Sequence, residues 1–368
     1  FMKGSVCNAL SQGLKEKTLL DKSPSSVRFA VAMTQKMKYP FTILPILLLL
    51  CSVTVSEIPI QLLRLSGPLA DRESEISGLS WKGDHLIFLP ENPERFPLGE
   101  YGSLFYLTRS ELVQAVNSEN DHDLLPKAIP FDDGGLLSNI PGFEGFEAIA
   151  FLDDELFMTI EARTNEGMMG YLVKGEVESG SGVIRLDPTT LREVSPQSDV
   201  HNMTYESLVL TGAGLMTFHE INGVGLNSNP EVVVYDFELA VKPSLSLEHL
   251  EYRITDATDI DSDGRFWLIN YYWPGDEAVM SNKDPLAERF GEGPSHLKSE
   301  AVERLVEFKV ENGRVKMTNH PPIQLELIEN DSRNWEGIVR FGESGFLMVT
   351  DKYPTTIFAF VPISELDK

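Results

Sequence analysis

From residue 57 onward, the chain alternates short apolar runs with turns rich in Gly, Pro, Asn and Asp. Runs of this kind, bounded by such residues, are typical of β-strands. Sustained helical periodicity is confined to two short patches, at 111–116 and 299–304. The pattern therefore predicts a single all-β domain over residues 57–368.

The strands repeat in five units with a common pattern. Each unit opens with a polar residue and a small residue, runs on as a strand, turns, and ends a second strand near another polar residue. The opening residues are Ser77, Glu147, Glu206, Asp256 and Glu336, and the closing residues are Glu91, Glu161, Glu220, Asn270 and Asp351. The two are 14 positions apart in the first four units and 15 in the fifth. A tight hairpin of this length brings both residues to one edge.

Further strand-like runs follow each hairpin and raise the count to about four strands per unit. Five such units favour a β-propeller with five four-stranded blades, and the gaps between units leave room for a sixth. The N-terminal run 58–65 can supply the last strand and close the ring. In this fold the innermost strands line a channel, so the ten polar residues would gather at one mouth.

Eight of these ten residues are carboxylates, and packed like charges need protons or a cation. Hard oxygen ligands favour calcium. The expected ligands are Ser77, Glu91, Glu147, Glu206, Asp256, Asn270, Glu336 and Asp351. The alternative is structural, because an acid at the start of an inner strand can cap backbone amides of the neighbouring blade.

Several other residues near the repeats are candidates for chemistry. Glu161 or Glu220 could act as a general base, with His219 beside them as a further catalytic candidate. Three cationic residues could contact an anionic ligand or could simply be solvated: Arg163, Lys352 and Arg333. The insertion 271–298 begins at the same mouth and is expected to be a binding loop.

The N-terminal segment has a different character. Residues 41–55 form an apolar run behind Lys36 and Lys38, which predicts a signal peptide over 33–56, with 1–32 as an upstream extension that the mature protein lacks. The run is short for a membrane span, although an uncleaved anchor is the alternative. We therefore expect a secreted or periplasmic protein without stable membrane insertion after cleavage.

The chain carries 31 basic and 56 acidic residues, a net charge of −25. This charge argues against nucleic-acid binding, which needs a basic surface. Without residues 1–56 the chain keeps 24 basic and 54 acidic residues, and it loses both cysteines, Cys7 and Cys51. The expected mature protein thus has no disulfide, thiol nucleophile or thiolate metal site.

A succession of motifs over about 75–360 resembles the phytase-like family (esterase-like activity of phytase). The motifs are Ile76–Ser80, Phe146–Ala150, Tyr205–Val209, Ile254–Ile260, Asn334–Ile338 and Phe346–Asp351. The resemblance implies a secreted or periplasmic β-propeller assigned to phosphoester hydrolysis. Two positions depart from the family pattern: 145–148 reads Gly-Phe-Glu-Ala where Asp-Pro-Glu-Gly is expected, and Asn270-Tyr271 stands in place of an acidic residue followed by Arg.

Three functions remain open on these grounds. The first is a calcium-dependent hydrolase of a small anionic or phosphorylated substrate. The second is a non-catalytic secreted propeller that binds a ligand or a protein and holds calcium structurally. The third is a sugar lactonase with the same acidic mouth. The sequence leaves the oligomeric state open.

Overall fold

The computed structural model of the protein describes residues 55–363, except 119–122, 199, 280, 282 and 330. The described residues fall within one contact unit, Ser52–Lys368. The predicted extension at 1–32 and nearly all of the predicted signal peptide at 33–56 lie outside the described residues. None of the helices in the described ranges is long and apolar enough to cross a membrane.

The prediction of an all-β domain is confirmed, with three sheets of 8, 11 and 4 strands. The 8-stranded sheet joins two antiparallel meanders, which correspond to the first and second repeat units. The first contains β3 (Ile76–Lys82), β4 (His85–Pro90), β5 (Gly102–Thr108) and β6 (Lys127–Asp132). The second contains β7 (Phe143–Leu152), β8 (Glu155–Thr164), β9 (Gly167–Val177) and β10 (Ile184–Val194). The outer strands β6 and β10 pair in parallel and link the two.

The 11-stranded sheet joins the third and fourth repeat units in the same way, through the parallel pair β15 and β19. The third unit contains β11 (Ser207–Thr211), β12 (Gly214–Phe218), β14 (Glu231–Tyr235) and β15 (Val241–Leu247). The fourth contains β16 (Leu250–Ala257), β17 (Arg265–Tyr272), β18 (Val302–Glu311) and β19 (Arg314–Met317). Short strands extend this sheet: β13 (Ile221–Asn222), β20 (Ile323–Leu325) and β1 (Glu57–Ile58).

The fifth repeat unit forms the 4-stranded sheet. Its strands are β21 (Trp335–Arg340), β22 (Gly345–Thr350), β23 (Phe358–Pro362) and β2 (Gln61–Leu63). The strand predicted near the N-terminus is present as β2, and it pairs antiparallel with β23. The two ends of the described chain therefore share one sheet.

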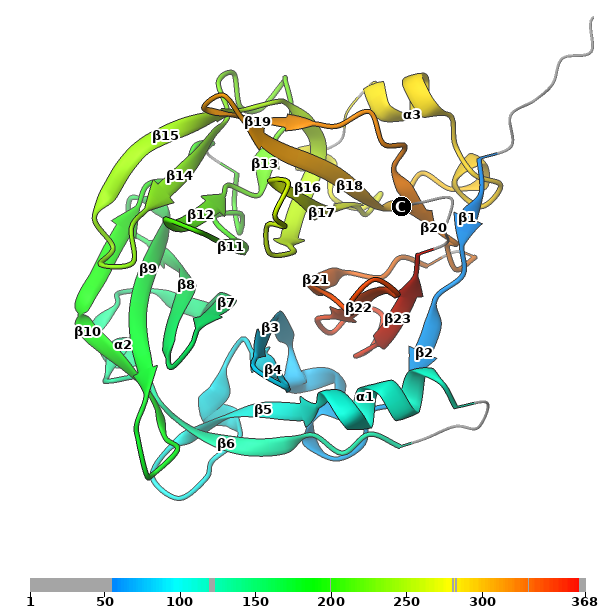
Figure 1. Cartoon of the computed structure of the whole chain (residues 1–368). Coiled ribbons are helices and arrows are strands. Elements are labelled where there is room, and N and C mark those ends of the chain that lie inside the picture. Colours follow the sequence, from blue (N-terminus) through cyan, green and yellow to red (C-terminus); the bar gives the residue numbers. More distant parts are fainter. Residues whose placement is uncertain are drawn as a thin grey trace, which may run out of the picture. The chain divides into compact units, whose positions relative to one another are not determined.

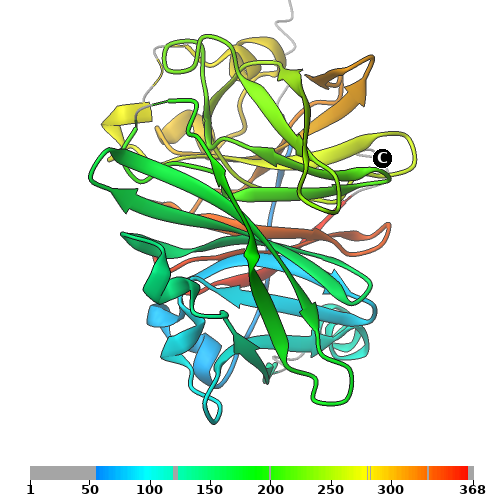
Figure 2. The ribbon, with the colours of Figure 1, turned by 90° about the vertical axis from the view of Figure 1, so that its left-hand side faces the viewer.

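The first strands of the five units surround a common centre (Figure 1). β3 contacts β7 and β21, β7 contacts β11, and β16 contacts both β11 and β21. Figure 2 shows the sheets from the side, with the hairpin strands running across the view. This arrangement carries the opening residues of all five units toward one centre.

Apolar layers fill the space between neighbouring units, and each layer contains an aromatic contact. The ring pairs, with centroid distances of 5.1 to 6.1 Å, are Phe88–Phe358, Phe131–Phe146, Phe157–Phe237, Phe218–Phe266 and Trp267–Phe346. Edge-on and tilted aromatic packing of this kind contributes beyond the buried area alone. The core thus lies between the sheets and leaves the centre to polar residues.

One of the two helical expectations is confirmed. The patch at 111–116 lies in α1 (Arg109–Val116), where Thr108 and Glu111 form a capping box. The helix expected at 299–304 is wrong, because β18 begins at Val302 and pairs with β17 from Val302 to Lys309. Burial between two strands overrides the weak helical pattern there. Within the described residues, the remaining helical elements are α2 (Leu136–Asn139), α3 (Pro285–Phe290) and five 3₁₀ turns, η1 (Pro68–Ala70), η2 (Arg72–Ser74), η3 (Pro93–Arg95), η4 (Glu277–Val279) and η5 (His296–Lys298).

Candidate functional site

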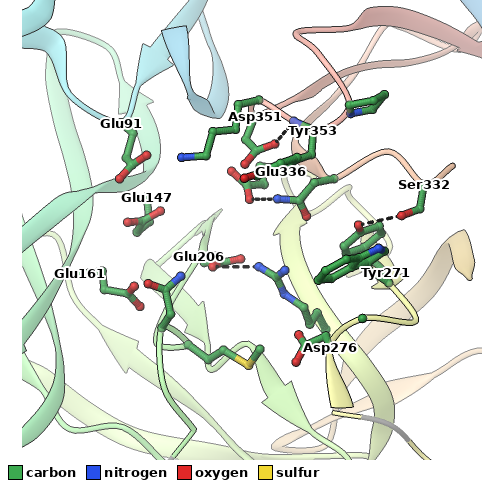
Figure 3. Close-up of a pocket in the computed structure, with 18 of the residues that line it drawn as sticks. Glu91, Glu147, Glu161, Glu206, Tyr271, Asp276, Ser332, Glu336, Asp351 and Tyr353 are labelled. Atoms are coloured by element: carbon green, nitrogen blue, oxygen red, sulfur yellow. Dashed lines mark hydrogen bonds and ion pairs between the residues drawn. The ribbon is translucent and has the colours of Figure 1, made fainter. Parts of the chain in front are cut away.

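An acidic pocket of about 720 Å³ lies at the meeting point of the inner strands. Its carboxylates are Glu91, Glu144, Glu147, Glu161, Glu206, Asp276, Asp331, Glu336 and Asp351. Figure 3 shows the labelled members of this set pointing into one space from different strands and loops. Arg253 and Lys352 supply the positive charge of its lining. Six carboxylates predicted from the repeat pattern, and Lys352, are thus brought together.

Irregular strand pairing aims several of these acids at the pocket. The register between β7 and β8 shifts between Phe146 and Ala148, which leaves Glu147 unpaired. The register between β21 and β22 shifts in the same way around Glu336. An extra residue of this kind bends its strand and turns its own side chain. In these two units the repeated acid is therefore the residue that the bulge directs toward the centre.

The small residue after the acid has its own physical reason. A Cβ atom on Gly337 would lie 2.7 Å from Val349 and 2.9 Å from Leu79. The inner strands approach so closely at this point that a Cβ atom on residue 337 would collide with both of these side chains. The pattern of an acid followed by a small residue therefore reports close packing around the centre, in addition to the acid itself.

Burial and mutual repulsion raise the pKa of several carboxyl groups of the lining. Burial, with the charge of Glu75, raises the pKa of Glu91 to about 7. Burial, with the charge of Glu220, raises the pKa of Glu161 to about 8. Burial first and neighbouring carboxylates second hold the pKa of Glu147 and Glu206 well above the usual range. The pocket thus needs protons or further cations at neutral pH.

Arg253 is the main internal counter-charge, and sequence reasoning missed it. It lies on β16, is nearly buried, and forms ion pairs with Glu220 and, at 3.5 Å between Nη2 and Oε1, with Glu206. Its guanidinium also lies 5.7 Å from the ring centroid of Tyr271. The signal available in the sequence was a lone basic residue, two positions before Thr255, in a strand that leads into a repeat motif.

Lys352 is held at the pocket by a second buried acid. Its ammonium group pairs with Glu75, which also pairs with Arg95. The backbone of Glu75 contributes as well, since its carbonyl accepts a hydrogen bond of 2.7 Å from the amide of Glu91. Glu75 therefore positions one cation and one carboxylate of the lining, although it does not belong to the repeat pattern.

Three of the predicted metal ligands do not line the pocket. Ser77 donates a hydrogen bond of 2.5 Å to the carbonyl of Phe146, and Asp256 Oδ2 accepts one of 2.7 Å from the amide of Ile338. Asn270 donates to the carbonyl of Glu251 and accepts from Nε of Arg304, each at 2.8 Å. All three side chains join neighbouring strands, and Asp256 does so as the structural alternative above expects, by accepting from a backbone amide of the neighbouring unit.

A register slip explains the error in the fourth unit. Ile254 pairs with Asn270 in the way that Phe146 pairs with Ile160. The residues equivalent to Glu147 and Glu161 are therefore Thr255 and Tyr271, each one position away from the residue that equal spacing selects. Thr255 also donates a hydrogen bond of 2.5 Å to the carbonyl of Trp335, as Ser77 does to that of Phe146.

The predicted catalytic residues near the third unit are buried behind the pocket lining. His219 Nδ1 accepts a hydrogen bond of 3.1 Å from the amide of Ile221, and burial lowers its pKa to about 4. Glu220 is fully buried against Arg253. Neither residue lines the pocket, whereas Glu161 does. A neutral, buried His219 fits a packing role.

The other two predicted ligand contacts also lie outside the lining. Arg163 is exposed near the end of β8. Arg333 is buried, and its Nε atom pairs with Glu303 at 2.7 Å while Nη2 donates to the carbonyl of Glu326 at 2.6 Å. The charge of Arg333 is thus neutralised by Glu303 within the fold and does not face a ligand.

Aromatic residues complete the lining, and the sequence reasoning did not single them out. Tyr271 and Trp273 come from the start of the insertion 271–298, and Tyr353 follows β22. The expectation that this insertion contributes to the mouth agrees with the position of Trp273, Gly275 and Asp276 in the lining. Aromatic faces beside carboxylates provide both stacking surface and hydrogen-bond acceptors.

The carboxylate oxygens of the lining are the kind of ligand that a hard cation prefers. Four buried carboxylate oxygens have no hydrogen-bond partner within the described part of the chain, and they belong to Glu144, Glu161, Glu206 and Glu220. Buried oxygens without a partner require a proton, a cation or water. In the described ranges, however, no three His, Cys, Asp or Glu side chains are already placed around one metal position. Calcium binding would therefore require these side chains to turn toward a shared ion.

No family model matches the sequence, and no curated protein matches it either. Membership of the phytase-like family thus stays a prediction. Among solved structures, a GH43 endo-arabinanase from Bacillus licheniformis matches with a TM-score of 0.47 and 11% identity, over 83% of this chain and 98% of its own. A GH62 α-L-arabinofuranosidase catalytic domain from Coprinopsis cinerea matches with a TM-score of 0.42 and 9% identity, over 83% and 98%. A luciferin-regenerating enzyme matches with a TM-score of 0.42 and 9% identity, over 84% and 96%. Similarity at this level says nothing of a shared activity.

Proposed function

We propose that the chain is a hydrolase on a five-bladed β-propeller closed by β2, with the acidic pocket as its active site. The fold proposal is supported by five consecutive meanders whose first strands contact one another around a common centre. The site proposal is supported by the convergence of carboxylates from separate repeat units into one pocket. Export to the cell exterior or periplasm belongs to the same proposal, and N-terminal sequencing of the mature protein tests it.

The reaction proposed first is calcium-dependent hydrolysis of a phosphoester. The observation that carries it is the set of partnerless buried oxygens on three carboxylates of the lining, Glu144, Glu161 and Glu206. A lining with this excess of acid repels a phosphate unless a cation neutralises it. Calcium would be held by Glu147, Glu206 and Glu336, with Glu91 and Asp351 beside them. When bound, it would neutralise phosphate charge and acidify a water molecule.

The remaining roles fall to side chains of the chain itself. Glu161, whose pKa of about 8 lies near neutrality, is the general base or acid. Lys352, oriented by Glu75, contacts the anionic end of the substrate at the pocket wall. Arg253 holds Glu206 and Glu220 in place through its two ion pairs. Glu161 thus transfers a proton, Lys352 neutralises charge on the substrate, and Arg253 positions two of the carboxylates.

A phosphatase assay tests this function. The purified protein is assayed on 4-nitrophenyl phosphate in millimolar calcium and after EGTA, alongside Glu206→Gln and Glu343→Gln. Glu343 is the matched control, because it is an exposed acid on the far turn of the β21–β22 hairpin. We expect turnover that chelation and Glu206→Gln each reduce at least 100-fold, while Glu343→Gln keeps it. Turnover that survives both changes contradicts the proposal.

A second function, hydrolysis of a glycosidic bond without metal, is favoured by a different observation. Glu91 and Glu161 combine pKa values of about 7 and 8 with positions in one pocket. A carboxylic acid that keeps its proton near pH 7 can protonate a leaving group, while a second carboxylate acts as base or nucleophile. Hydrolysis of 4-nitrophenyl glycosides that is indifferent to EGTA and lost in Glu161→Gln would select this function over the first.

A further inference from the structure

Trp273 differs from every other tryptophan of the chain. Its side chain is 54% exposed although it lines the acidic pocket. Trp267 and Trp335 are 3% and 0% exposed, and Trp81 lies beneath the guanidinium of Arg109, 3.8 Å from its ring centroid. A large apolar ring left open to solvent at the wall of a pocket is available to a ligand.

The loop holds this ring in a defined place. Gly275 lies against it, since a Cβ atom on Gly275 would be 2.3 Å from two ring carbons of Trp273. The turn is closed by a hydrogen bond of 2.9 Å from the amide of Asp276 to the carbonyl of Trp273. One edge of the indole is thus packed on the loop. A ring fixed before binding loses little conformational freedom when a ligand stacks on it.

The two tyrosine rings of the lining, Tyr271 and Tyr353, are already engaged by guanidinium groups. The guanidinium of Arg253 lies 5.7 Å from the ring centroid of Tyr271. The guanidinium of Arg72 lies 4.8 Å from the ring centroid of Tyr353. Among the described residues, no cation or second aromatic ring is recorded over Trp273 in this way. The stacking surface that the pocket offers to a ligand is therefore that of Trp273.

The carboxylates that share the pocket lining with Trp273 determine which kind of ring suits it. Asp276 lies three residues on in the same loop, and Asp331 and Glu144 belong to the same lining. Carboxylates accept hydrogen bonds from hydroxyl groups, and an indole face accepts an apolar C–H face. A sugar ring presents both, with hydroxyl donors around its edge and C–H groups on its faces. A purely aromatic ligand would leave the acceptors unpaired and desolvated, which costs affinity.

We propose that Trp273 is the stacking platform of a subsite for a pyranose ring, which is the non-reacting part of the substrate. This inference rests on the pocket being the active site, as proposed above. It names the class of the bound group and leaves open whether a phosphoester or a glycosidic bond is cleaved. Trp273 is then a specificity-determining residue for either reaction.

Binding of simple pyranosides to the intact protein tests the subsite without turnover. Tryptophan fluorescence and calorimetry are recorded with methyl α-D-glucopyranoside and its galacto and manno isomers, and with phenol and glycerol as probes that lack a sugar ring. At least one pyranoside should change the emission and bind at least tenfold more tightly than phenol or glycerol. Phenol that binds as tightly as the best pyranoside overturns the proposal, as does the absence of any pyranoside binding.

Variants then assign the signal to one residue. Trp273→Ala should weaken pyranoside binding about tenfold and remove the emission change, and Trp273→Phe should weaken it less. Gly275→Ala displaces the ring without removing it and should weaken binding as Trp273→Ala does, with an unchanged melting temperature as the check on folding. Trp81→Phe, outside the pocket, should bind normally. Normal binding by Trp273→Ala refutes the assignment.

These results separate this inference from the proposed function. Pyranoside binding with no hydrolysis of any ester or glycoside leaves the subsite in place and removes the hydrolase. Calcium-dependent phosphatase activity that is unchanged in Trp273→Ala on every substrate, with no pyranoside binding, does the reverse.

Discussion

The second and fourth repeat units carry an acid at nearly the same place on their inner strands, but the two acids have different roles in the structure. Glu147, at the bulge in β7, points into the pocket (Figure 3). Asp256 lies in β16 one position after Thr255, which is the residue equivalent to Glu147. Its side chain accepts a hydrogen bond from the amide of Ile338 on the neighbouring strand. A repeated acid is therefore either part of the pocket or a link between strands, and the register of its bulge decides which.

The two positions should also respond to mutation with opposite signs. Asp256 stabilises the fold by satisfying a buried amide, so its loss leaves that amide without an acceptor. Glu147 is crowded by Glu161 and Glu91, so its charge opposes folding when no cation is present. The comparison thus separates residues such as Asp256, which stabilise the fold, from residues such as Glu147, whose mutual repulsion the rest of the fold must offset.

The largest effect expected from this comparison is on stability. Asp256→Ala should lower the free energy of unfolding by about 1–3 kcal/mol, because the buried amide of Ile338 loses its partner. Asp256→Asn keeps an acceptor oxygen and should cost less. Glu147→Gln should leave stability at pH 8 unchanged or higher in the absence of calcium. Urea unfolding measures all three, and a loss in Glu147→Gln as large as in Asp256→Ala would refute the distinction.

The pH dependence of stability gives a second, smaller effect. The folded pKa values of Glu91 and Glu161, about 7 and about 8, lie above the usual value near 4.3 in an unfolded chain. Between about pH 5 and pH 8 the folded protein therefore binds more protons than the unfolded chain. By linkage, stability falls as the pH rises through this window, by at most about 1.4 kcal/mol per pH unit for each group.

Urea unfolding in EGTA at several pH values measures this slope. Glu161→Gln should flatten the upper half of the window, because it removes the group that titrates near pH 8. Glu343→Gln is again the matched control and should keep the slope of the wild type. Stability that rises with pH between 5 and 8 would contradict the charge crowding in the pocket.

The smallest effect tests the register of the fourth unit. Thr255→Val removes the hydroxyl that donates to the carbonyl of Trp335 while keeping the shape of the side chain, and it should cost about 1 kcal/mol. Ser77→Ala removes the equivalent bond to the carbonyl of Phe146 and should cost about the same. Urea unfolding that finds either variant as stable as the wild type would argue against the equivalence of Ser77 and Thr255.

The sequence was informative wherever the pattern was local. Short apolar runs between turns predicted the all-β class, and equal spacing of polar residues across tight hairpins predicted the paired inner strands and six acids of the lining. These features follow from strand periodicity and turn geometry, which depend on neighbours in the chain. The position of Lys352 at the pocket could be found in the same way, because it follows the closing acid of the fifth unit.

What failed depends on pairing and contacts that cannot be read from the local sequence. Equal spacing placed Asp256 and Asn270 in the ring because the register between β16 and β17 cannot be counted from one strand alone. Arg333 resembled a ligand contact until Glu303, 30 residues earlier, was seen to pair with it. Arg253 and Glu75 fall outside the repeat pattern, and only the assembled pocket reveals their ion pairs.

Calorimetric titration of the chelator-treated protein with calcium tests the central claim most directly. If the pocket is a cation-binding active site, calcium binds with defined stoichiometry, and both Glu206→Gln and Glu336→Gln weaken binding at least tenfold while Glu343→Gln does not. Heat that is absent, or that is the same in all four proteins, would contradict the claim and leave the carboxylates of the pocket neutralised by protons alone.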